Sequence, residues 1–240
     1  MAEVWTVAPE WEAILGHGFG LEEPEALYAG AEPVPGGRGT TRRIRRAGRT
    51  FLLKRESRGG LAGRFLPDLY LRRGPFLSEW AAARRAAEAD LAPPLAARAF
   101  VRRGPLLAVF TLSEEIGHAR SLAEVLSQDG VAPELLRRCG KAVAALHRAG
   151  LVHGDLNAGN ILLLPNGPIL FVDFRHSRVL RGLPPSSLRG RNLRRLERSL
   201  RKVSLRAGRS LPPEALAALH QGYAEGWEAV EVEAPGPGGG

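Results

Sequence analysis

The sequence predicts an α+β chain of two lobes, with a β-rich N-terminal lobe followed by a helical C-terminal lobe. Two observations lead to this prediction. Short strand-like runs around glycine turns, with one helix among them, fill residues 1–112, whereas amphipathic helical patterns dominate residues 113–233. Separate runs of strands and helices are typical of this fold class. The glycine- and proline-rich residues 234–240 predict a disordered tail.

The N-terminal lobe is expected to contain two hairpins and one helix. Residues 41–55 predict a hairpin that turns at Gly48, and residues 99–112 predict a second hairpin around Gly104. Between the two hairpins, the alanine-rich residues 75–89 favour a helix with a proline in its first turn.

The C-terminal lobe is expected to be helical, with one small hairpin. Residues 121–124 (Ser-Leu-Ala-Glu) form a capping box that opens a short helix. Residues 133–149 predict a longer helix, which Gly150 ends. Its apolar residues recur at helical spacing: Leu135, Cys139, Val143 and Leu146. Residues 161–164 and 169–174 predict two short strands joined by a turn, and helices follow.

The composition indicates a cytoplasmic protein. Cys139 is the only cysteine among the 240 residues, so an intrachain disulfide is impossible. The N-terminal residues lack the pattern of a signal peptide, and no apolar run approaches the length of a membrane-spanning helix.

The basic charge of the chain is concentrated in one segment. The net charge is +9, and residues 175–209 contain 12 Lys or Arg and one acidic residue, Glu197. Such a local excess favours an anionic partner, although a solvated arginine-rich face is the alternative. Six basic residues are predicted to cover the surface of one helix whose leucines face the core: Arg191, Arg194, Arg195, Arg198, Arg201 and Lys202.

One polar stretch carries a catalytic pattern. Asp155 and Asn160 stand five residues apart, and Asp173 follows thirteen residues after Asn160. This is the spacing of the catalytic loop of protein-kinase-like enzymes. Each residue alone also suits a turn, but the ordered set, with His153-Gly154 before Asp155 and Phe174 after Asp173, predicts a two-lobe kinase.

The chemistry of phosphoryl transfer assigns the roles. A carboxylate must orient the attacking hydroxyl and accept its proton, and Asp155 is the predicted base. Magnesium prefers oxygen ligands and bridges the phosphates of ATP, so Asn160 and Asp173 are its predicted ligands. ATP and Mg²⁺ are therefore the expected cofactors.

The ATP phosphates also need a lysine on an upstream strand. Lys54 supplies it, since the adjacent Arg55 points to the opposite face of the strand. A helix carboxylate should hold the lysine, with Glu79 as the first candidate and Glu88 as the second.

A glycine-rich loop precedes the first hairpin. Gly37 and Gly39 are predicted to let backbone N–H groups approach the phosphates, although the full Gly-x-Gly-x-x-Gly pattern is incomplete. The chain has no P-loop motif.

On these residues the sequence resembles the lipopolysaccharide kinase family, in particular its 3-deoxy-D-manno-octulosonic acid (Kdo) kinases. The resemblance covers about residues 36–205 and rests on residues 54–63, 153–163 and 192–202. It implies an enzyme that phosphorylates the Kdo sugar of Kdo-lipid A at the inner face of the bacterial inner membrane. The implied partners are a lipid-linked anionic sugar and an anionic membrane surface, to which the protein would bind peripherally.

Two departures from the family pattern stand out. The family has Arg where this chain has Lys54, and Asp-Phe-Asp where this chain has Asp173-Phe174-Arg175. The metal ligand Asp173 is kept, so the second departure concerns only a further carboxylate at Arg175.

Other functions fit the sequence less well. A small-molecule phosphotransferase of the aminoglycoside or choline kinase type is the main alternative, but a cationic acceptor would favour an acidic lobe. A protein kinase is disfavoured because no Ala-Pro-Glu motif follows Asp173. A binding module without activity is disfavoured by the complete set of Lys54, Asp155, Asn160 and Asp173. Nucleic-acid binding would rest on charge alone and is not expected.

Overall fold

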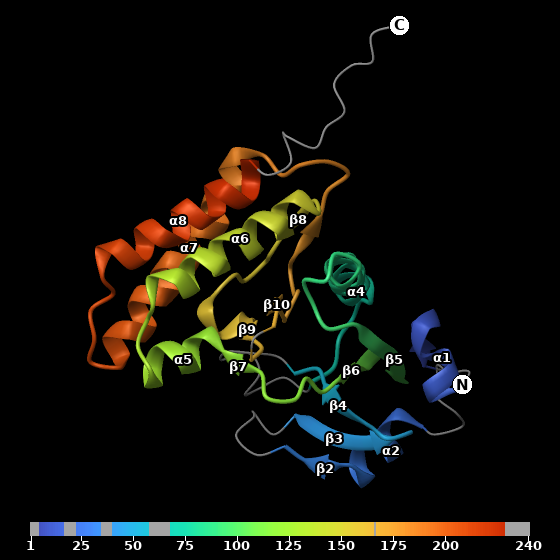
Figure 1. Cartoon of the computed structure of the whole chain (residues 1–240). Coiled ribbons are helices and arrows are strands. Elements are labelled where there is room, and N and C mark those ends of the chain that lie inside the picture. The colour runs from blue at the N-terminus through green and yellow to red at the C-terminus, as the bar shows by residue number, and fades with distance from the viewer. Residues whose placement is uncertain (1–4, 17–22, 35–39, 58–67, 166, 229–240) are drawn as a thin grey trace, which may run out of the picture. The chain divides into compact units, whose positions relative to one another are not determined.

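The computed structural model describes residues 5–16, 23–34, 40–57, 68–165 and 167–228 (Figure 1). The chain forms two compact units. The first comprises residues 1–77 and 93–117, and the second comprises residues 78–92 and 118–240. The predicted tail at residues 234–240 lies outside the described residues.

The first unit is built on an antiparallel sheet of six strands in the order β1-β5-β6-β4-β3-β2. Two predicted hairpins, β3–β4 and β5–β6, form its centre. Both central residues of the β3–β4 turn, Ala47 and Gly48, have positive φ, which matches the twist of the paired strands. The strands are β1 (Thr6–Val7), β2 (Glu32–Pro33), β3 (Thr41–Arg46), β4 (Arg49–Arg55), β5 (Leu95–Arg103) and β6 (Leu106–Glu114).

Aromatic and aliphatic side chains form the core of this unit. Phe76, Phe100, Leu107 and Val109 make one buried cluster, against which Tyr70 packs. The unit also contains the short helices η1 (Pro9–Trp11), α1 (Glu12–Leu15) and α2 (Pro24–Gly30). Strand β4 lies between β3 and β6, so its residues are held on both sides.

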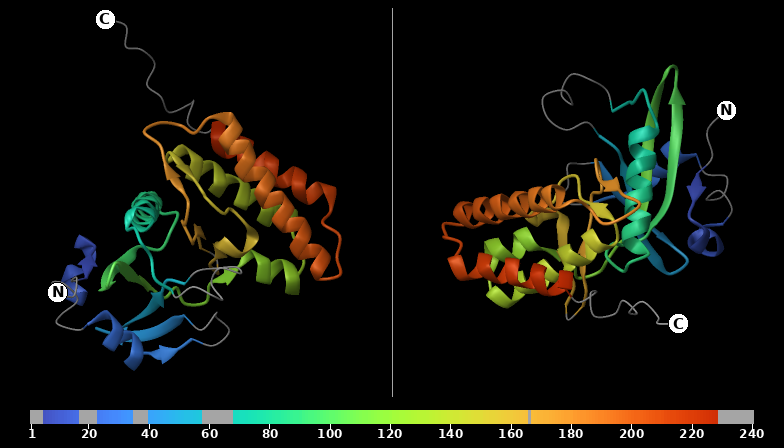
Figure 2. Two further views of the ribbon diagram at one scale, coloured as in Figure 1. Left: turned by 180° about the vertical axis from the view of Figure 1, so that it is seen from behind. Right: turned by 90° about the horizontal axis from the view of Figure 1, so that it is seen from above.

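Helices make up most of the second unit. They are α5 (Leu122–Gln128), α6 (Pro133–Arg148), α7 (Ser186–Arg206), α8 (Pro213–Glu228) and residues 78–87 of α4 (Gly74–Ala87). The helices α6 and α8 lie side by side (Figures 1 and 2). Their backbones meet at Gly140 and Gly222, where an added Cβ would collide with main-chain atoms of Leu219 and Arg137.

Two small sheets carry the loops of this unit. Strands β7 (Arg120–Ser121), β9 (Ile161–Leu163) and β10 (Ile169–Phe171) form one sheet, in the order β10-β9-β7. Strands β8 (Leu151–Val152) and β11 (Arg178–Val179) form the other. The residues predicted for catalysis follow β8 and β10.

The structure confirms the predicted α+β class and the main elements. The capping box forms, because Ser121 Oγ accepts from Glu124 N and Glu124 Oε2 accepts from Ser121 N. One packing detail differs: Leu136 is buried in α6, whereas Leu135 is only partly buried. Within the described residues, no helix has both the length and the apolarity to span a bilayer.

Candidate active site

The predicted catalytic residues lie on a loop that is held by its own side chains. Residues 153–160 connect β8 to β9 and end in the short helix η3 (Ala158–Asn160). The Asp155 carbonyl accepts from Asn157 Nδ2 at 3.0 Å and from Asn160 Nδ2 at 2.9 Å. Asn157 Oδ1 accepts from Gly159 N at 2.8 Å and so caps η3. The five-residue spacing between Asp155 and Asn160 therefore closes a compact turn.

His153 links this loop to the segment that carries Asp173. Its ring is 1% exposed, and its Nδ1 accepts from Asp155 N at 3.1 Å. Nε2 therefore carries the proton and donates to the Val172 carbonyl at 3.1 Å. Burial lowers the pKa of His153, which favours this neutral form. In the structure His153 therefore packs in the core and joins two backbone segments by hydrogen bonds.

Close packing requires a glycine at position 154, directly before the predicted base. A Cβ at this position would collide with the main-chain atoms of Arg175 and His176. The Gly154 N–H also donates to Ser177 Oγ at 2.9 Å. The predicted catalytic loop thus packs directly on the chain that follows Asp173.

Asp173 stands in a strained backbone conformation directly after the β10 strand region. Its φ is 61°, a left-handed value that residues other than glycine seldom adopt, and its side chain is exposed. The preceding residue is fixed, since Val172 N donates to the Asn160 carbonyl at 3.0 Å. Strain of this kind persists where surrounding contacts impose it, and it concentrates at functional sites.

The side chains of Asn160 and Asp173 suit a magnesium ion. Asn160 Nδ2 donates to the Asp155 carbonyl, which leaves Oδ1 as the side-chain atom that can bind a metal ion. Together with the Asp173 carboxylate this gives hard oxygen donors, and Mg²⁺ commonly takes one or two protein ligands and completes its shell with phosphates and water. The described residues include no group of three His, Cys, Asp or Glu side chains that could hold a metal ion.

One stripe of helix α7 holds the predicted catalytic loop. Asn192 Oδ1 accepts from His153 N at 3.0 Å, and its Nδ2 donates to the His153 carbonyl at 2.9 Å. One turn further along, Arg195 Nη1 donates to the Gly154 carbonyl at 2.6 Å, and Arg195 Nε lies 3.1 Å from Asp155 Oδ1. Another turn on, Ser199 Oγ accepts from the backbone N–H of Ala158 at 3.1 Å.

A buried histidine supports this stripe from α6. His147 is fully buried, with Nε2 3.2 Å from Asn192 Oδ1 and Nδ1 2.9 Å from the Tyr223 hydroxyl. Burial lowers the pKa of His147 to about 4. The neutral ring therefore accepts from Tyr223 and donates to Asn192, which in turn holds His153.

In the first unit, Lys54 lies beside a carboxylate that the sequence analysis did not consider. Lys54 Nζ is 3.3 Å from Glu56 Oε2, and the Glu56 side chain is 1% exposed. Glu56 Oε1 accepts from the Thr111 hydroxyl at 3.0 Å, and Thr111 Oγ1 accepts from Arg98 Nε at 3.2 Å. Arg98 also donates to the Phe76 carbonyl. Lys54 therefore stands at the end of a buried polar network.

The other residues predicted for ATP binding are placed as follows. Gly37 and Gly39 lie outside the described residues. Glu79 is buried on α4, and Glu88 is exposed and pairs with Arg84 and Arg85. Both glutamates belong to the second unit and Lys54 to the first, so the pairing of Lys54 with a helix carboxylate stays a prediction.

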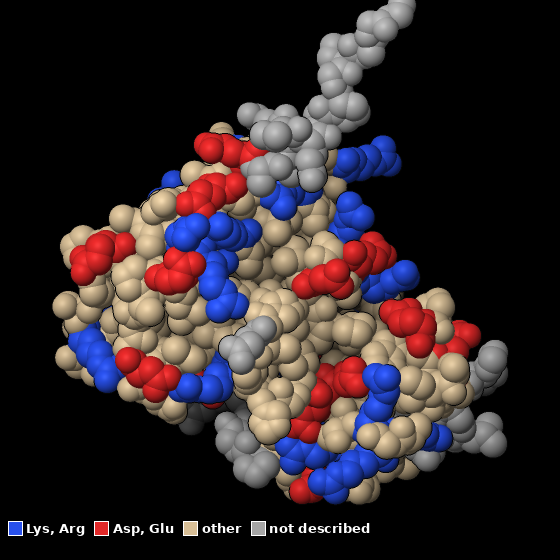
Figure 3. Space-filling model, in the orientation of Figure 1, with Lys and Arg blue, Asp and Glu red and all other residues tan. Residues whose placement is uncertain are grey.

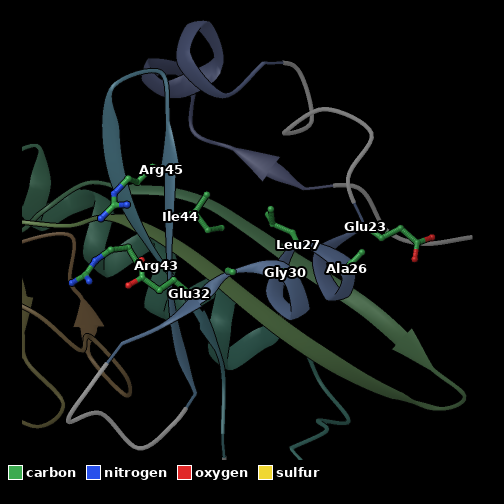
Figure 4. A pocket seen from close by; sticks show the side chains of 9 residues that line it. Glu23, Ala26, Leu27, Gly30, Glu32, Arg43, Ile44 and Arg45 are labelled. Carbon is green, nitrogen blue, oxygen red and sulfur yellow. The ribbon is translucent and has the colours of Figure 1, made fainter.

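A pocket of about 730 Å³ lies in the first unit between α2 and β3 (Figure 4). Leu27 and Ile44 give it an apolar wall, and Arg43 pairs with Glu115 at its border. Among the described residues predicted for ATP or metal binding, none lines this pocket.

Sequence reasoning missed four residues that hold the site. Asn192, Arg195 and Ser199 recur at three and four residues, which is the helical spacing of one face, but arginine-rich surroundings hid this polar stripe. Glu56 follows Lys54 by two residues, which places both on the same face of a strand. Strand periodicity could have found it.

The architecture is that of the protein-kinase-like fold class. Comparison with solved structures supports the fold: the chain resembles WaaP, from a structure of "WaaP in complex with acyl carrier protein", with a TM-score of 0.62. The match covers 92% of this chain and 88% of WaaP at 19% sequence identity.

The chain belongs to the lipopolysaccharide kinase (Kdo/WaaP) family, whose sequence model matches residues 32–223. A 3-deoxy-D-manno-octulosonic acid kinase of Stenotrophomonas maltophilia is 36% identical over 87% of this chain and 85% of the relative. A kinase of the same name from Vibrio vulnificus is 31% identical over 78% of this chain and 80% of the relative. The chain is therefore a kinase of lipopolysaccharide core biosynthesis that acts on a sugar hydroxyl, and kinase activity implies ATP as the donor.

Proposed function

We propose that the chain phosphorylates the Kdo sugar of Kdo-lipid A, with Asp155 as the base and with Mg²⁺ held by Asn160 and Asp173. The observation that carries this proposal is the bridge through His153, which joins the backbone of Asp155 to that of Val172. Through this bridge, the backbone at Asp155, the predicted base, is linked to the residue that precedes Asp173, the predicted metal ligand.

The proposed reaction is an in-line transfer. A sugar hydroxyl attacks the γ-phosphorus of ATP, the bond from that phosphorus to the bridging oxygen breaks, and ADP leaves with the electron pair. Asp155 orients the hydroxyl and accepts its proton. Lys54, held by Glu56, contacts the phosphates, and Gly37 and Gly39 supply backbone N–H groups to them. Asn160 and Asp173 would hold Mg²⁺, which would supply positive charge to offset that of the phosphates.

We further propose that the protein works at the inner face of the inner membrane, where α7 contacts anionic lipid. The leucines Leu193, Leu196 and Leu200 are buried, which turns the basic side chains of the helix outward. The α7 basic surface consists of five exposed residues: Arg191, Arg194, Arg198, Arg201 and Lys202. By contrast, basic and acidic side chains are interspersed on the face drawn in Figure 3. Each exposed cation near such a membrane contributes about 1 kcal/mol.

The direct test is incubation of the protein with labelled ATP and Kdo-lipid A. Lipid IVA, an aminoglycoside and an unrelated protein serve as parallel acceptors, and Asp155→Asn serves as the inactive enzyme. Label in Kdo-lipid A alone supports the proposal. Label in the aminoglycoside alone would instead support the small-molecule phosphotransferase alternative.

A further inference from the structure

We propose that Arg195 is the residue that admits an acidic sugar next to the catalytic base, by binding the acceptor's carboxylate while it stays paired with Asp155. This inference rests on the proposed function and names the chemical feature of the acceptor that the site recognises. It is carried by the position, exposure and charge of Arg195.

Arg195 is the charged member of the α7 stripe that touches the catalytic loop. Its Nε lies 3.1 Å from Asp155 Oδ1, and its Nη1 donates to the Gly154 carbonyl at 2.6 Å. These contacts use two of the five N–H donors of a guanidinium. The Arg195 side chain is 47% exposed and that of Asp155 is 49% exposed, so the pair is open to a ligand.

Two neutral residues of α7 already anchor the loop, so Arg195 is not needed for anchoring alone. Asn192 binds both backbone groups of His153, and Ser199 binds the backbone N–H of Ala158. Both are neutral and bind only main-chain groups of the loop in these contacts. Because Asn192 and Ser199 anchor the loop on either side of Asp155, we infer that the half-exposed Arg195 guanidinium serves a function other than anchoring the loop.

The charge of the acceptor sugar indicates what this function is. The relatives are named as kinases of 3-deoxy-D-manno-octulosonic acid, a sugar that carries a carboxylate at neutral pH. When such an acceptor presents a hydroxyl to Asp155, two carboxylates approach each other and repel. A cation between them offsets this repulsion, and a planar guanidinium can bind a carboxylate through two N–H groups. Arg195 is placed for both contacts because it already touches Asp155.

The test compares two acceptors that differ only in this charge: a Kdo glycoside with a free carboxylate and its methyl ester. Steady-state KM and kcat are measured for wild type, Arg195→Gln, Arg195→Lys and Arg206→Gln. Arg206 is exposed in the last turn of the same helix, and its replacement removes the same charge. Thermal melting and ATP binding establish that each variant is folded.

The expected result is a selective loss of acceptor recognition. Arg195→Gln should raise the KM for the acid by about 10- to 100-fold and change that for the ester by less than about threefold, the range expected for one charged contact. Arg195→Lys should recover part of the preference for the acid, and Arg206→Gln should behave as wild type.

Two results would overturn the inference, and they differ from each other. If Arg195→Gln lowers kcat equally for acid and ester at unchanged KM, Arg195 acts only through Asp155 as a positioning residue. If wild type phosphorylates neither glycoside nor Kdo-lipid A, the proposed function fails and the inference fails with it.

Discussion

Lys54 Nζ lies 3.3 Å from Glu56 Oε2, a buried carboxylate that directly follows strand β4, two residues further along the chain. Lys54 lies on β4, an interior strand of the sheet, so its backbone is held by hydrogen bonds to β3 on one side and to β6 on the other. The chain thus holds its predicted ATP-site lysine from within the first unit. The predicted partners, Glu79 and Glu88, belong to the other unit.

The first prediction distinguishes these carboxylates. Glu56→Gln should raise the KM for ATP, because Lys54 loses its charged partner while the Thr111 hydroxyl keeps an acceptor. Glu56→Ala should also lower the free energy of unfolding by about 1–3 kcal/mol, since a buried hydroxyl loses its acceptor. Nucleotide titration and urea denaturation measure the two effects. A raised KM in Glu79→Gln or Glu88→Gln, with Glu56→Gln unchanged, would favour the helix carboxylate instead.

The second prediction concerns the base. Asp155→Asn should lower turnover by about 100-fold or more, the scale of one general base, while ATP affinity changes little. The carbonyl of residue 155, which holds Asn157 and Asn160, remains in the variant. Near-normal turnover in a coupled assay of ADP release would exclude Asp155 as the base.

The third prediction concerns the metal ligand. Asp173→Asn should remove the magnesium dependence of ATP binding, because one carboxylate plus phosphates commonly holds this ion. Asn is the better probe than Ala, since Asn tolerates the left-handed φ of 61° at this position. Calorimetric titration with and without Mg²⁺ makes the measurement. Retention of the full magnesium effect would show that another residue binds the ion.

The fourth prediction concerns the α7 basic surface. Replacing Arg194, Arg198 and Arg201 together with Gln should weaken binding to vesicles that contain anionic lipid and leave the melting temperature unchanged. In wild type, high salt should release the protein, because screening shortens the reach of these charges. The triple variant should also raise the KM for a lipid-linked acceptor more than for a free sugar. Equal vesicle binding by both proteins would identify the surface as a solvated face.

The fifth prediction concerns stability at acidic pH. The folded chain keeps His147 neutral, with a pKa of about 4 against an ordinary value of 6.5. Between pH 6.5 and about 4 the unfolded chain binds a proton at this position that the folded chain does not, so unfolding becomes easier as pH falls. The contribution approaches about 1.4 kcal/mol per pH unit and is absent above this window.

His147→Gln should therefore flatten the fall in unfolding free energy from pH 6.5 to 4, as measured by urea denaturation at several pH values. His153 is also buried with a lowered pKa, so part of the slope should remain. An unchanged slope in the variant would mean that His147 contributes no such linkage.

The sequence alone determined the fold class and most elements, which the structure confirms, and it supplied the candidate catalytic set, which stays a prediction. Local rules explain why these features can be predicted. The β3–β4 turn needs residues that accept positive φ, the capping box needs Ser121 and Glu124 three residues apart, and the loop from Asp155 to Asn160 closes through hydrogen bonds within itself. Each of these is a contact between near neighbours in the sequence.

Only the tertiary structure decided which distant side chains support the site. Arg195 meets Asp155 across forty positions of sequence, whereas helical spacing predicts it among the surface arginines of α7. Asn192 and His147 likewise act across helices, through contacts that no local pattern specifies. Amphipathic spacing gives the face of a helix but not what that face touches. Packing of α7 against the loop makes one arginine of a basic helix a partner of the predicted base.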